Sequence, residues 1–465
     1  MGTPQNLKRI FMKKTVRIGS GAGFWGDALD PAVELLEKGK LDYLSFDFLA
    51  ELTMALLQRL RSKNPQAGYV PDVVDYMRAL MPLARKSGTT LVSNGGGVNP
   101  MAAGKQIVEV ARQLGLTGTK IGVIEGDDVL HRLDEILASG VTLVNMDTGA
   151  IDFARVRARV VAANVYTDAS GIIEALEKGA NVVVAGRVSD NALYVGPLMH
   201  EFGWRYDESH KDRIAAAVTV GHVLECGGAS SGGLHSRFAE MPNMGSLGFP
   251  FAEFSDDGTA VITKLEGTGG AVDQFTVKEH LLYEINDPRR YIMPDGVADF
   301  TSLKLEEIGK NRVRLSDMTG TGRPDLLKVV IGYEDGWIGE GMLFFPWPLA
   351  YARAQKAKET MLERFERLGL KSDEIQFDFI GVNMLHGPAA PLNGDELNEV
   401  GLRGAVRTRT KDEAEKVRRA CAHMWIMGPG GTSFGTPMKP RPVVSLWPTL
   451  IPRELIRQTV TVLEA

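Results

Sequence analysis

Polar side chains that can bind an anion or move a proton follow several short apolar runs, each where a predicted strand ends. Asn94 follows one such run, and Arg187 and Asp190 follow the most apolar one, Val182–Ala185. In open α/β sheets, ligands bind beyond the carboxyl ends of the strands, so these side chains are expected at one crevice. Asn94 is suited to orienting a carbonyl, and Arg187 to clamping a carboxylate or phosphate. The alternative is an ion pair between Arg187 and Asp190 that makes both residues structural.

An acidic stretch follows another apolar run. The sequence EGDD, which contains Asp127, comes directly after Ile121–Ile124. Carboxylates at a strand end suit a hard metal ion or a general base. They equally suit the start of a helix near Val129, where acidic side chains are favoured. We predict Asp127 as a substrate-binding residue and leave the presence of a metal open.

His222 and Glu225 are three residues apart, before the glycine-rich stretch GGASSGG. On a helix this spacing places both side chains on one face. The pair suits acid–base catalysis, because a neighbouring carboxylate raises the basicity of an imidazole; it also suits a metal site. Cys226 is a candidate nucleophile if its pKa is lowered. The alternative is that His222 is an ordinary core residue.

Glycine-rich turns recur at predicted strand ends. Gly21, Gly23 and Gly26 match the pattern G-x-G-x-x-G, with Asp47 downstream where a nucleotide ribose would lie. A nicotinamide site, a site for an anion or acyl group, and a plain structural turn all stay open, because Trp25 is bulky for a pyrophosphate. Glycines also let backbone N–H groups approach a ligand, which makes the SNGGG turn, with Gly96 and Gly97, a second candidate.

Lys264 ends a predicted hairpin around Asp257-Gly258 and precedes the turn GTGG. It is a candidate for holding a phosphate or forming a Schiff base, against the default of a solvated hairpin lysine.

These residues need a scaffold, and the pattern of apolar runs indicates an α/β fold. Short runs without alternation, separated by amphipathic helices, predict a mostly parallel, Rossmann-like sheet in the N-terminal half. An eight-fold barrel is the alternative. The runs include a predicted strand at Val141–Asn145. The second half predicts a mixed α+β domain with long helices at Leu349–Leu368 and Lys411–Trp425. We predict a flexible leader at 1–14, an α/β domain at 15–235 and the mixed domain at 236–465.

Composition excludes several classes of protein. The chain has 465 residues, of which 44% are hydrophobic and 24% charged, with a net charge of −5. Such values are typical of globular proteins and give no electrostatic basis for nucleic-acid binding. No apolar window is long enough for a transmembrane helix, and no secretory signal is visible. Two cysteines do not make a disulfide framework, so we expect a cytoplasmic protein.

Several of these motifs together resemble the acyclic terpene utilisation (AtuA) family. The strings are VRIGSGAGFWGD, SNGGGVNP, GANVVVAGRVSDNAL, GHVLECGGASSGG and VITKLEGTGG, and the resemblance runs from about Val16 past Leu446. It implies breakdown of branched acyclic terpenoids as coenzyme A thioesters. The motif positions that it carries over are Gly21, Asp47, Asn94, Gly96, Arg187, Asp190, Glu225, Gly232, Gly233, Lys264, Gly269 and Tyr283.

The leading hypothesis is a lyase or hydratase that acts on a branched acyl thioester or a related carboxylic acid. We expect Glu225 or Asp190 as base, Arg187 and Asn94 as polarising groups, and His222 as proton carrier, with Lys264 also in the catalytic set. The cofactor is left open, with a coenzyme A thioester as substrate. Alternatives are a noncatalytic acyl-binding subunit, which works with a small partner, or a nucleotide-dependent enzyme that uses the first glycine turn. A homo-oligomer is the usual state for such enzymes.

Overall fold

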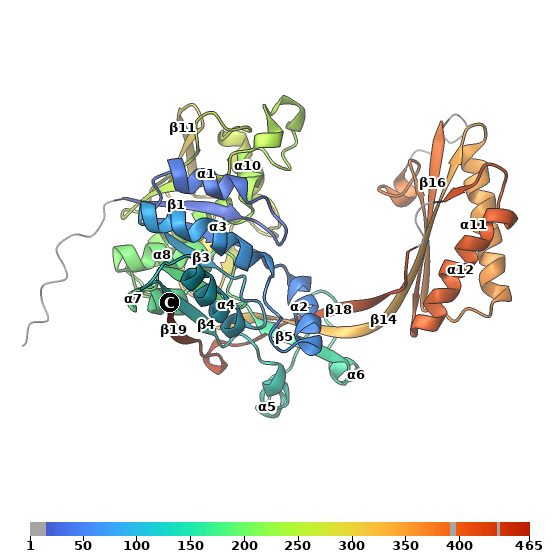
Figure 1. Ribbon diagram of the computed structural model, residues 1–465, viewed down its shortest axis with the longest axis horizontal. Helices are drawn as coiled ribbons and strands as arrows, with labels where there is room; N and C mark the ends of the chain where they lie inside the picture. Colours follow the sequence, from blue (N-terminus) through green and yellow to red (C-terminus); the bar gives the residue numbers. More distant parts are fainter. Residues whose placement is uncertain (1–14, 391–396, 435–437) are drawn as a thin grey trace, which may run out of the picture. The chain divides into compact units, whose positions relative to one another are not determined.

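The computed structural model describes residues 15–390, 397–434 and 438–465, so the predicted leader at 1–14 lies outside it. The chain divides into two compact units (Figure 1). Unit 1 contains the residues up to Arg155, Val161–Gly332 and Leu446–Ala465; unit 2 contains Val156–Val160 and Tyr333–Ser445. Residues 235 and 236, at the predicted domain boundary, both belong to unit 1. The division into independent domains at that point stays a prediction.

The centre of unit 1 is a set of parallel strands from the N-terminal half of the chain. In spatial order they are β1 (Thr15–Ala22), β2 (Tyr43–Phe46), β3 (Thr90–Ser93), β6 (Val182–Ala185) and β4 (Lys120–Glu125). Each pairs with its neighbour in parallel. Their carboxyl ends therefore meet at one edge, as the apolar runs predict.

Antiparallel strands extend this sheet on both sides to ten strands. Beside β1 lie β7 (Pro250–Ser255), β8 (Ala260–Lys264), β12 (Arg312–Ser316) and β11 (Lys304–Gly309), and beside β4 lies β19 (Thr459–Glu464). The sheet is therefore mixed, and the prediction of a mostly parallel Rossmann-like sheet is wrong in this respect. The predicted hairpin at Asp257-Gly258 is confirmed as β7–β8. It covers the edge of β1, whose backbone would otherwise lie unpaired.

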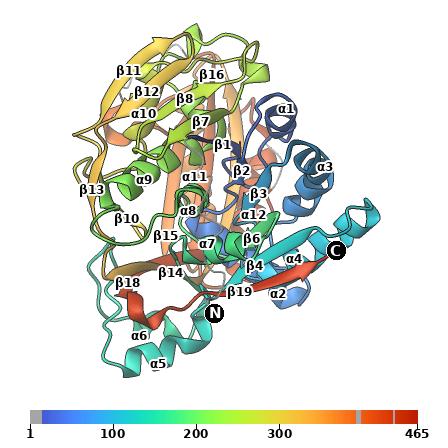
Figure 2. The ribbon, with the colours of Figure 1, turned by 90° about the vertical axis from the view of Figure 1, so that its left-hand side faces the viewer.

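Helices cover both faces of the sheet (Figure 2). On one face, α1 (Asp30–Lys38), α3 (Asp72–Ser87) and α4 (Pro100–Gln113) share a core with side chains such as Leu44 and Ile121. On the other, α7 (Ser170–Glu177), α8 (Ala192–Phe202) and α9 (Lys211–Glu225) pack on side chains such as Ile18 and Val183. Burial on both faces explains why these strands are unbroken apolar runs.

The other elements of unit 1 lie in the connections. They are α2 (Glu51–Lys63), η1 (Leu130–Arg132), α5 (Leu133–Ala138), α6 (Ala154–Arg157), β5 (Val160–Val165), η2 (Gly227–Ser231), η3 (Phe238–Glu240), η4 (Met244–Ser246), α10 (Gln274–Leu281), η7 (Arg453–Leu455), and a small sheet of β9 (Tyr291–Met293), β10 (Gly296–Asp299) and β13 (Thr319–Thr321). Both α6 and β5 run across the division between the units.

The predicted strand at Val141–Asn145 is wrong, because this segment has no regular secondary structure and the Val144 N–H donates to the Thr142 carbonyl at 3.1 Å. The Leu143 carbonyl accepts a hydrogen bond from Trp447 Nε1 at 3.0 Å, and the Asn145 side chain caps the turn that follows. The segment Val141–Asn145 is therefore held by side-chain hydrogen bonds and single backbone hydrogen bonds, and not by a sheet.

Unit 2 has its own core and holds most of a second sheet. This sheet contains β15 (Glu374–Ile380), β16 (Glu399–Thr408), β14 (Leu326–Pro346) and β17 (Ser433–Phe434), with β18 (Arg441–Pro452) and β5 paired to β14. The strands β14, β18 and β5 each also include residues of unit 1. The predicted long helices are confirmed as α11 (Ala350–Arg367) and α12 (Lys411–Met427), and η5 (Gly387–Ala389) is a single short turn. Side chains such as Leu343, Ala354 and Val417 form the core of this unit. Among the described helices, none has the length and apolar character needed to cross a membrane.

Candidate active site

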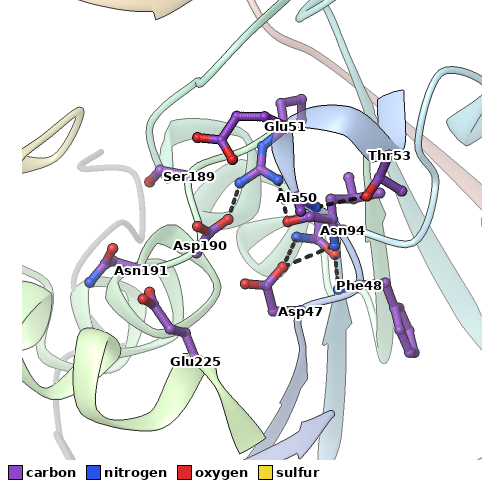
Figure 3. Close-up of polar contacts among 12 residues, drawn as sticks. Asp47, Phe48, Ala50, Glu51, Thr53, Asn94, Ser189, Asp190, Asn191 and Glu225 are labelled. Carbon is purple, nitrogen blue, oxygen red and sulfur yellow. Dashed lines mark hydrogen bonds and ion pairs between the residues drawn. The ribbon is translucent and has the colours of Figure 1, made fainter. Parts of the chain in front are cut away.

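Asp47 and Asn94 follow β2 and β3 and touch at the carboxyl edge of the sheet (Figure 3). Asn94 Nδ2 donates to Asp47 Oδ1 at 2.6 Å, and Asn94 Oδ1 accepts from the Phe48 N–H at 2.8 Å. The Leu49 N–H also donates to Asp47 Oδ1, at 3.2 Å. Both ends of the Asn94 amide are therefore used within the protein. Asn94 orients Asp47 and is not positioned to polarise a substrate itself.

Arg187 follows β6 and is fully buried. Its Nη1 donates to the Leu49 carbonyl at 2.7 Å, its Nη2 donates to Asp190 Oδ1, and its guanidinium lies 4.1 Å from the centre of the Tyr166 ring. The ion pair weighed as the structural alternative is thus present. Arg187 ties the loop after β2 to the loop after β6 and supplies positive charge beneath the site.

Two buried carboxyl groups are influenced by the charge of this arginine. They are Asp47, which follows β2, and Glu225 in the last turn of α9 (Figure 3). Burial raises the pKa of Asp47 to about 7, helped by the charge of Glu225 and opposed by Arg187. Burial also raises the pKa of Glu225 well above its ordinary value, helped by Glu284. Like-charged groups in one buried site resist ionising together, so at neutral pH the pair retains at least one proton.

His222 lies one turn before Glu225 on the buried face of α9, as the three-residue spacing predicts. Its Nδ1 lies 3.1 Å from Glu225 Oε1 and 3.2 Å from the Tyr291 hydroxyl. Burial lowers the pKa of His222 to about 4, so the ring is neutral at physiological pH. The contact with Glu225 is therefore a hydrogen bond between neutral groups.

These groups open into a cavity of about 730 Å³ within unit 1. The cavity has polar groups from the strand ends and α9, and apolar groups from later segments. Its lining residues are Gly23, Asp47, Leu49, Ala50, Glu51, Met146, Tyr166, Asp190, His222, Glu225, Cys226, Tyr283, Glu284, Tyr291, Ile292, Met293, Pro294, Pro324, Asp325, Leu326, Leu327, Lys328 and Leu450. The groups that can transfer a proton, Asp47, Glu225 and His222, lie at one side of the cavity, and much of the remaining lining is apolar. This arrangement suits an organic substrate with one reactive end.

The comparison with protein-family models decides the identity of the chain. The model described as "Acyclic terpene utilisation family protein AtuA" matches residues 16–462. The chain belongs to the AtuA family. The resemblance of its motifs is thereby confirmed, and the family name suggests a role in acyclic terpene utilisation. No curated protein and no solved structure matches this AtuA-family chain.

Cys226 lines the cavity of this AtuA-family protein, but burial raises the pKa of its thiol above the ordinary range. A thiol that stays protonated is a poor nucleophile. No group of three or more His, Cys, Asp or Glu side chains that could hold a metal ion occurs among the described residues. The cavity thus offers carboxyl, imidazole and phenol groups for proton transfer.

The first glycine turn is filled by protein. A Cβ on Gly21, inside β1, would lie 2.3 Å from the Phe46 ring, and one on Gly23 would lie 2.4 Å from the backbone of Cys226. The Gly23 N–H donates to Asp27 Oδ2 at 2.8 Å. The acidic Asp27 and this close packing leave no anion cradle before α1, so the geometry does not favour a nucleotide there.

The SNGGG turn is also engaged internally. The Gly96 N–H donates to the Ala185 carbonyl at 3.0 Å, and the Gly97 N–H to the Asn94 carbonyl at 3.2 Å. Gly97 has φ +52°, and a Cβ there would meet Leu57. These glycines bring β3 and β6 together and do not present free N–H groups to the cavity.

The other predicted residues lie outside the cavity. Lys264 Nζ donates to the Thr268 carbonyl at 2.7 Å, and Asp127 accepts from Asn164 Nδ2 at 2.8 Å. Gly232, Gly233 and Gly269 pack closely against Met241, Gly228 and Asn243, respectively. From the predicted set, the cavity is lined by Gly23, Asp47, Asp190, His222, Glu225, Cys226 and Tyr283. Arg187 and Asn94 lie directly behind these residues.

Some lining residues have no counterpart in the predicted set. Tyr166 follows β5, Tyr291 begins β9 and Lys328 lies in β14. None of these three elements is among the central parallel strands β1, β2, β3, β6 and β4. The polar segment from Tyr291 to Asp295 is visible in the sequence, but no local pattern links it to His222. Lys328 has no distinguishing signal, because a single lysine in a strand is ordinarily solvated.

Proposed function

We propose that this protein is a lyase or hydratase of branched acyl breakdown, acting on a coenzyme A thioester or a related acid. The observation that carries the proposal is the pair of buried carboxyl groups, Asp47 and Glu225, with neutral His222 beside them. The pair opens into a cavity whose other walls are largely apolar. The family's role in acyclic terpene utilisation is consistent with a branched apolar substrate.

Hydration of a double bond next to a carbonyl needs two proton transfers. A base takes a proton from water while the water oxygen bonds to the β-carbon of the substrate. An acid then delivers a proton to the α-carbon of the resulting enolate. Two carboxyl groups that share a proton can supply both, since the ionised member is the base and the protonated member the acid. In the reverse direction the same groups eliminate water. We assign Asp47 and Glu225 to these roles and His222 to moving the proton away through Glu225.

The direct test is turnover of a branched 2,3-unsaturated acyl thioester, followed by loss of its conjugated absorbance. Asp47→Asn and Glu225→Gln are expected to lower kcat by about 100-fold or more, the range for loss of an acid–base group. The thioester dissociation constant should change little. Full turnover in both variants would refute the assignment, and tight binding without any turnover in the native protein would favour the acyl-binding subunit.

Glu201→Gln is the matched control for these substitutions. Glu201 Oε1 accepts a hydrogen bond from the Tyr43 hydroxyl at 2.7 Å, a bond that a glutamine carbonyl can keep. Glu201 is not among the lining residues of the cavity. This variant should retain native turnover, so any loss in it would point to a general effect on folding.

A further inference from the structure

The cavity is lined by many carboxyl groups and very few basic ones. Its acidic residues are Asp47, Glu51, Asp190, Glu225, Glu284 and Asp325. Apart from the neutral His222, the only basic side chain among the lining residues, all of which the structure describes, is that of Lys328. Apart from His222 and Lys328, every titratable side chain that a ligand meets in this cavity is therefore an acid.

Lys328 is already engaged. Its Nζ lies 2.9 Å from Glu51 Oε1 and 5.1 Å from the centre of the Tyr166 ring. A ligand carboxylate that reaches this ammonium group would lie beside the carboxylate of Glu51. The repulsion between the two carboxylates would offset the gain from the new ion pair.

Arg187 is closer to the centre of the site but is not accessible to a ligand. It does not line the cavity, and Tyr166, Leu49 and Asp190 occupy its guanidinium. Its charge acts through Asp47 and Glu225, whose pKa values it lowers against the effect of burial. The positive charge of Arg187 thus stabilises the ionised forms of Asp47 and Glu225 and is not offered to a ligand.

Burial of a carboxylate without a cationic partner is costly, and nearby carboxylates raise the cost further. A thioester or ester of the same acid carries no charge, and its apolar chain can pack on walls such as Met146, Ile292 and Leu327. We propose that the cavity accepts the acyl group only as an uncharged derivative, a thioester or ester, and rejects the free carboxylate. This inference rests on the proposed function, which leaves thioester and acid open, and narrows its substrate class.

Direct binding tests the inference without any need for turnover. The probes share one branched ten-carbon chain and differ in the head group: the free acid, its N-acetylcysteamine thioester and the corresponding primary amine. Calorimetric titration of the native protein at pH 8 should give a dissociation constant for the thioester about tenfold or more below that of the acid. Acid binding as tight as thioester binding would overturn the inference, and so would tighter binding of the amine, which would assign the cavity to a cation.

Releasing Lys328 gives the sharpest comparison. Glu51→Gln removes the carboxylate that engages this lysine, so the affinity for the free acid should rise about tenfold while that for the thioester changes little. Adding Lys328→Met to Glu51→Gln should abolish the gain, and Glu201→Gln alone should show none. No gain for the acid in Glu51→Gln would count against the inference.

The result also separates this inference from the proposed function. Selective binding of the thioester without turnover would refute the lyase or hydratase and leave the inference standing. Turnover of the thioester together with equally tight binding of the acid would support the lyase or hydratase and refute the inference about the head group.

Discussion

At Asp47, several interactions that favour the ionised carboxylate compete with burial, which disfavours it. The Asn94 amide, the Leu49 N–H and the charge of Arg187 all favour its ionised form. Burial outweighs them, and the pKa rises to about 7. A carboxyl group poised near neutral pH is suited to proton transfer, because either protonation state is readily available.

The raised pKa of Asp47 predicts a pH dependence of stability. The unfolded carboxyl ionises near its ordinary value of about 4, so between about pH 4 and pH 7 the folded state binds the extra proton. The contribution of Asp47 to the free energy of unfolding therefore falls as the pH rises through this window. Asp47→Asn should remove this component, on the order of 2–4 kcal/mol, and give a flatter pH profile. Urea unfolding of both proteins at pH 4.5 and pH 8 measures it, and identical profiles would contradict it.

The sequence predicts those site residues whose reactive side chains come directly after a predicted strand. Asp47, Asn94 and Arg187 all follow buried apolar runs, and the sheet brings them together. The role of Asn94 differs from the prediction, because both ends of its amide are used by Asp47 and Phe48. Which partner a polar group finds depends on the packing of distant loops, and a sequence pattern does not contain that information.

Among the elements, one arginine in the short helix η7 supports the cavity wall. Arg453 Nη1 donates to Asp168 Oδ2 at 2.7 Å, Nη2 to the Pro294 carbonyl at 2.6 Å and Nε to the Pro324 carbonyl at 2.9 Å. Pro294 and Pro324 both line the cavity, whereas Arg453 does not. Its planar fork thus fixes the segments that follow β9 and precede β14.

Loss of this support should act on binding more than on chemistry. Arg453→Ala is expected to raise KM for the thioester about tenfold and to change kcat less than threefold, since Asp47 and Glu225 stay in place. Arg453→Lys should not restore KM, because an ammonium group lacks the fixed geometry for three acceptors. Steady-state kinetics separate the two parameters; a fall in kcat at unchanged KM would place Arg453 in the chemistry.

The contact between the end of β1 and the end of α9 predicts the effect of Gly23→Val. A Cβ at Gly23 would lie 2.4 Å from the Cys226 backbone, so the substitution should lower the free energy of unfolding by about 2 kcal/mol or more. Gly245→Val is the control, because a Cβ there meets nothing within 4 Å. Thermal unfolding compares the two variants. Native stability in Gly23→Val would contradict this close contact, and native stability together with loss of nucleotide binding would support the nucleotide hypothesis for this turn.

The elements that the sequence predicts well are those with a strong local pattern, either an unbroken apolar run or the spacing of an amphipathic helix. The runs at β3, β4 and β6 and the helices α11 and α12 lie where their patterns place them. The hairpin β7–β8 is also local, but its attachment to β1 is not. The buried side chains of β1, such as Val16 and Ile18, pack under helices whether or not its edge is paired, so nothing in its sequence tells whether that edge is covered.

At the scale of the whole molecule, the described residues form separate cores in the two units. The cores on the two faces of the ten-stranded sheet lie entirely in unit 1, and the core that includes Leu343, Ala354 and Val417 lies entirely in unit 2. We therefore predict two calorimetric transitions on heating. The thioester probe should raise the midpoint of only one, by linkage, because the cavity lies wholly in unit 1. A single transition, or an equal shift of both, would show that the units unfold together.

The division of unit 1 along the chain sets an order on its folding during synthesis. Leu446–Ala465 supplies β19, Arg453 and Leu450 to unit 1, yet the ribosome makes this segment after the whole of Tyr333–Ser445. Until this segment has been made and has left the exit tunnel, β4 has no β19 to pair with and its edge stays open. A nascent chain stalled before Leu446 would expose that edge to chaperones, and its cavity would lack part of its wall.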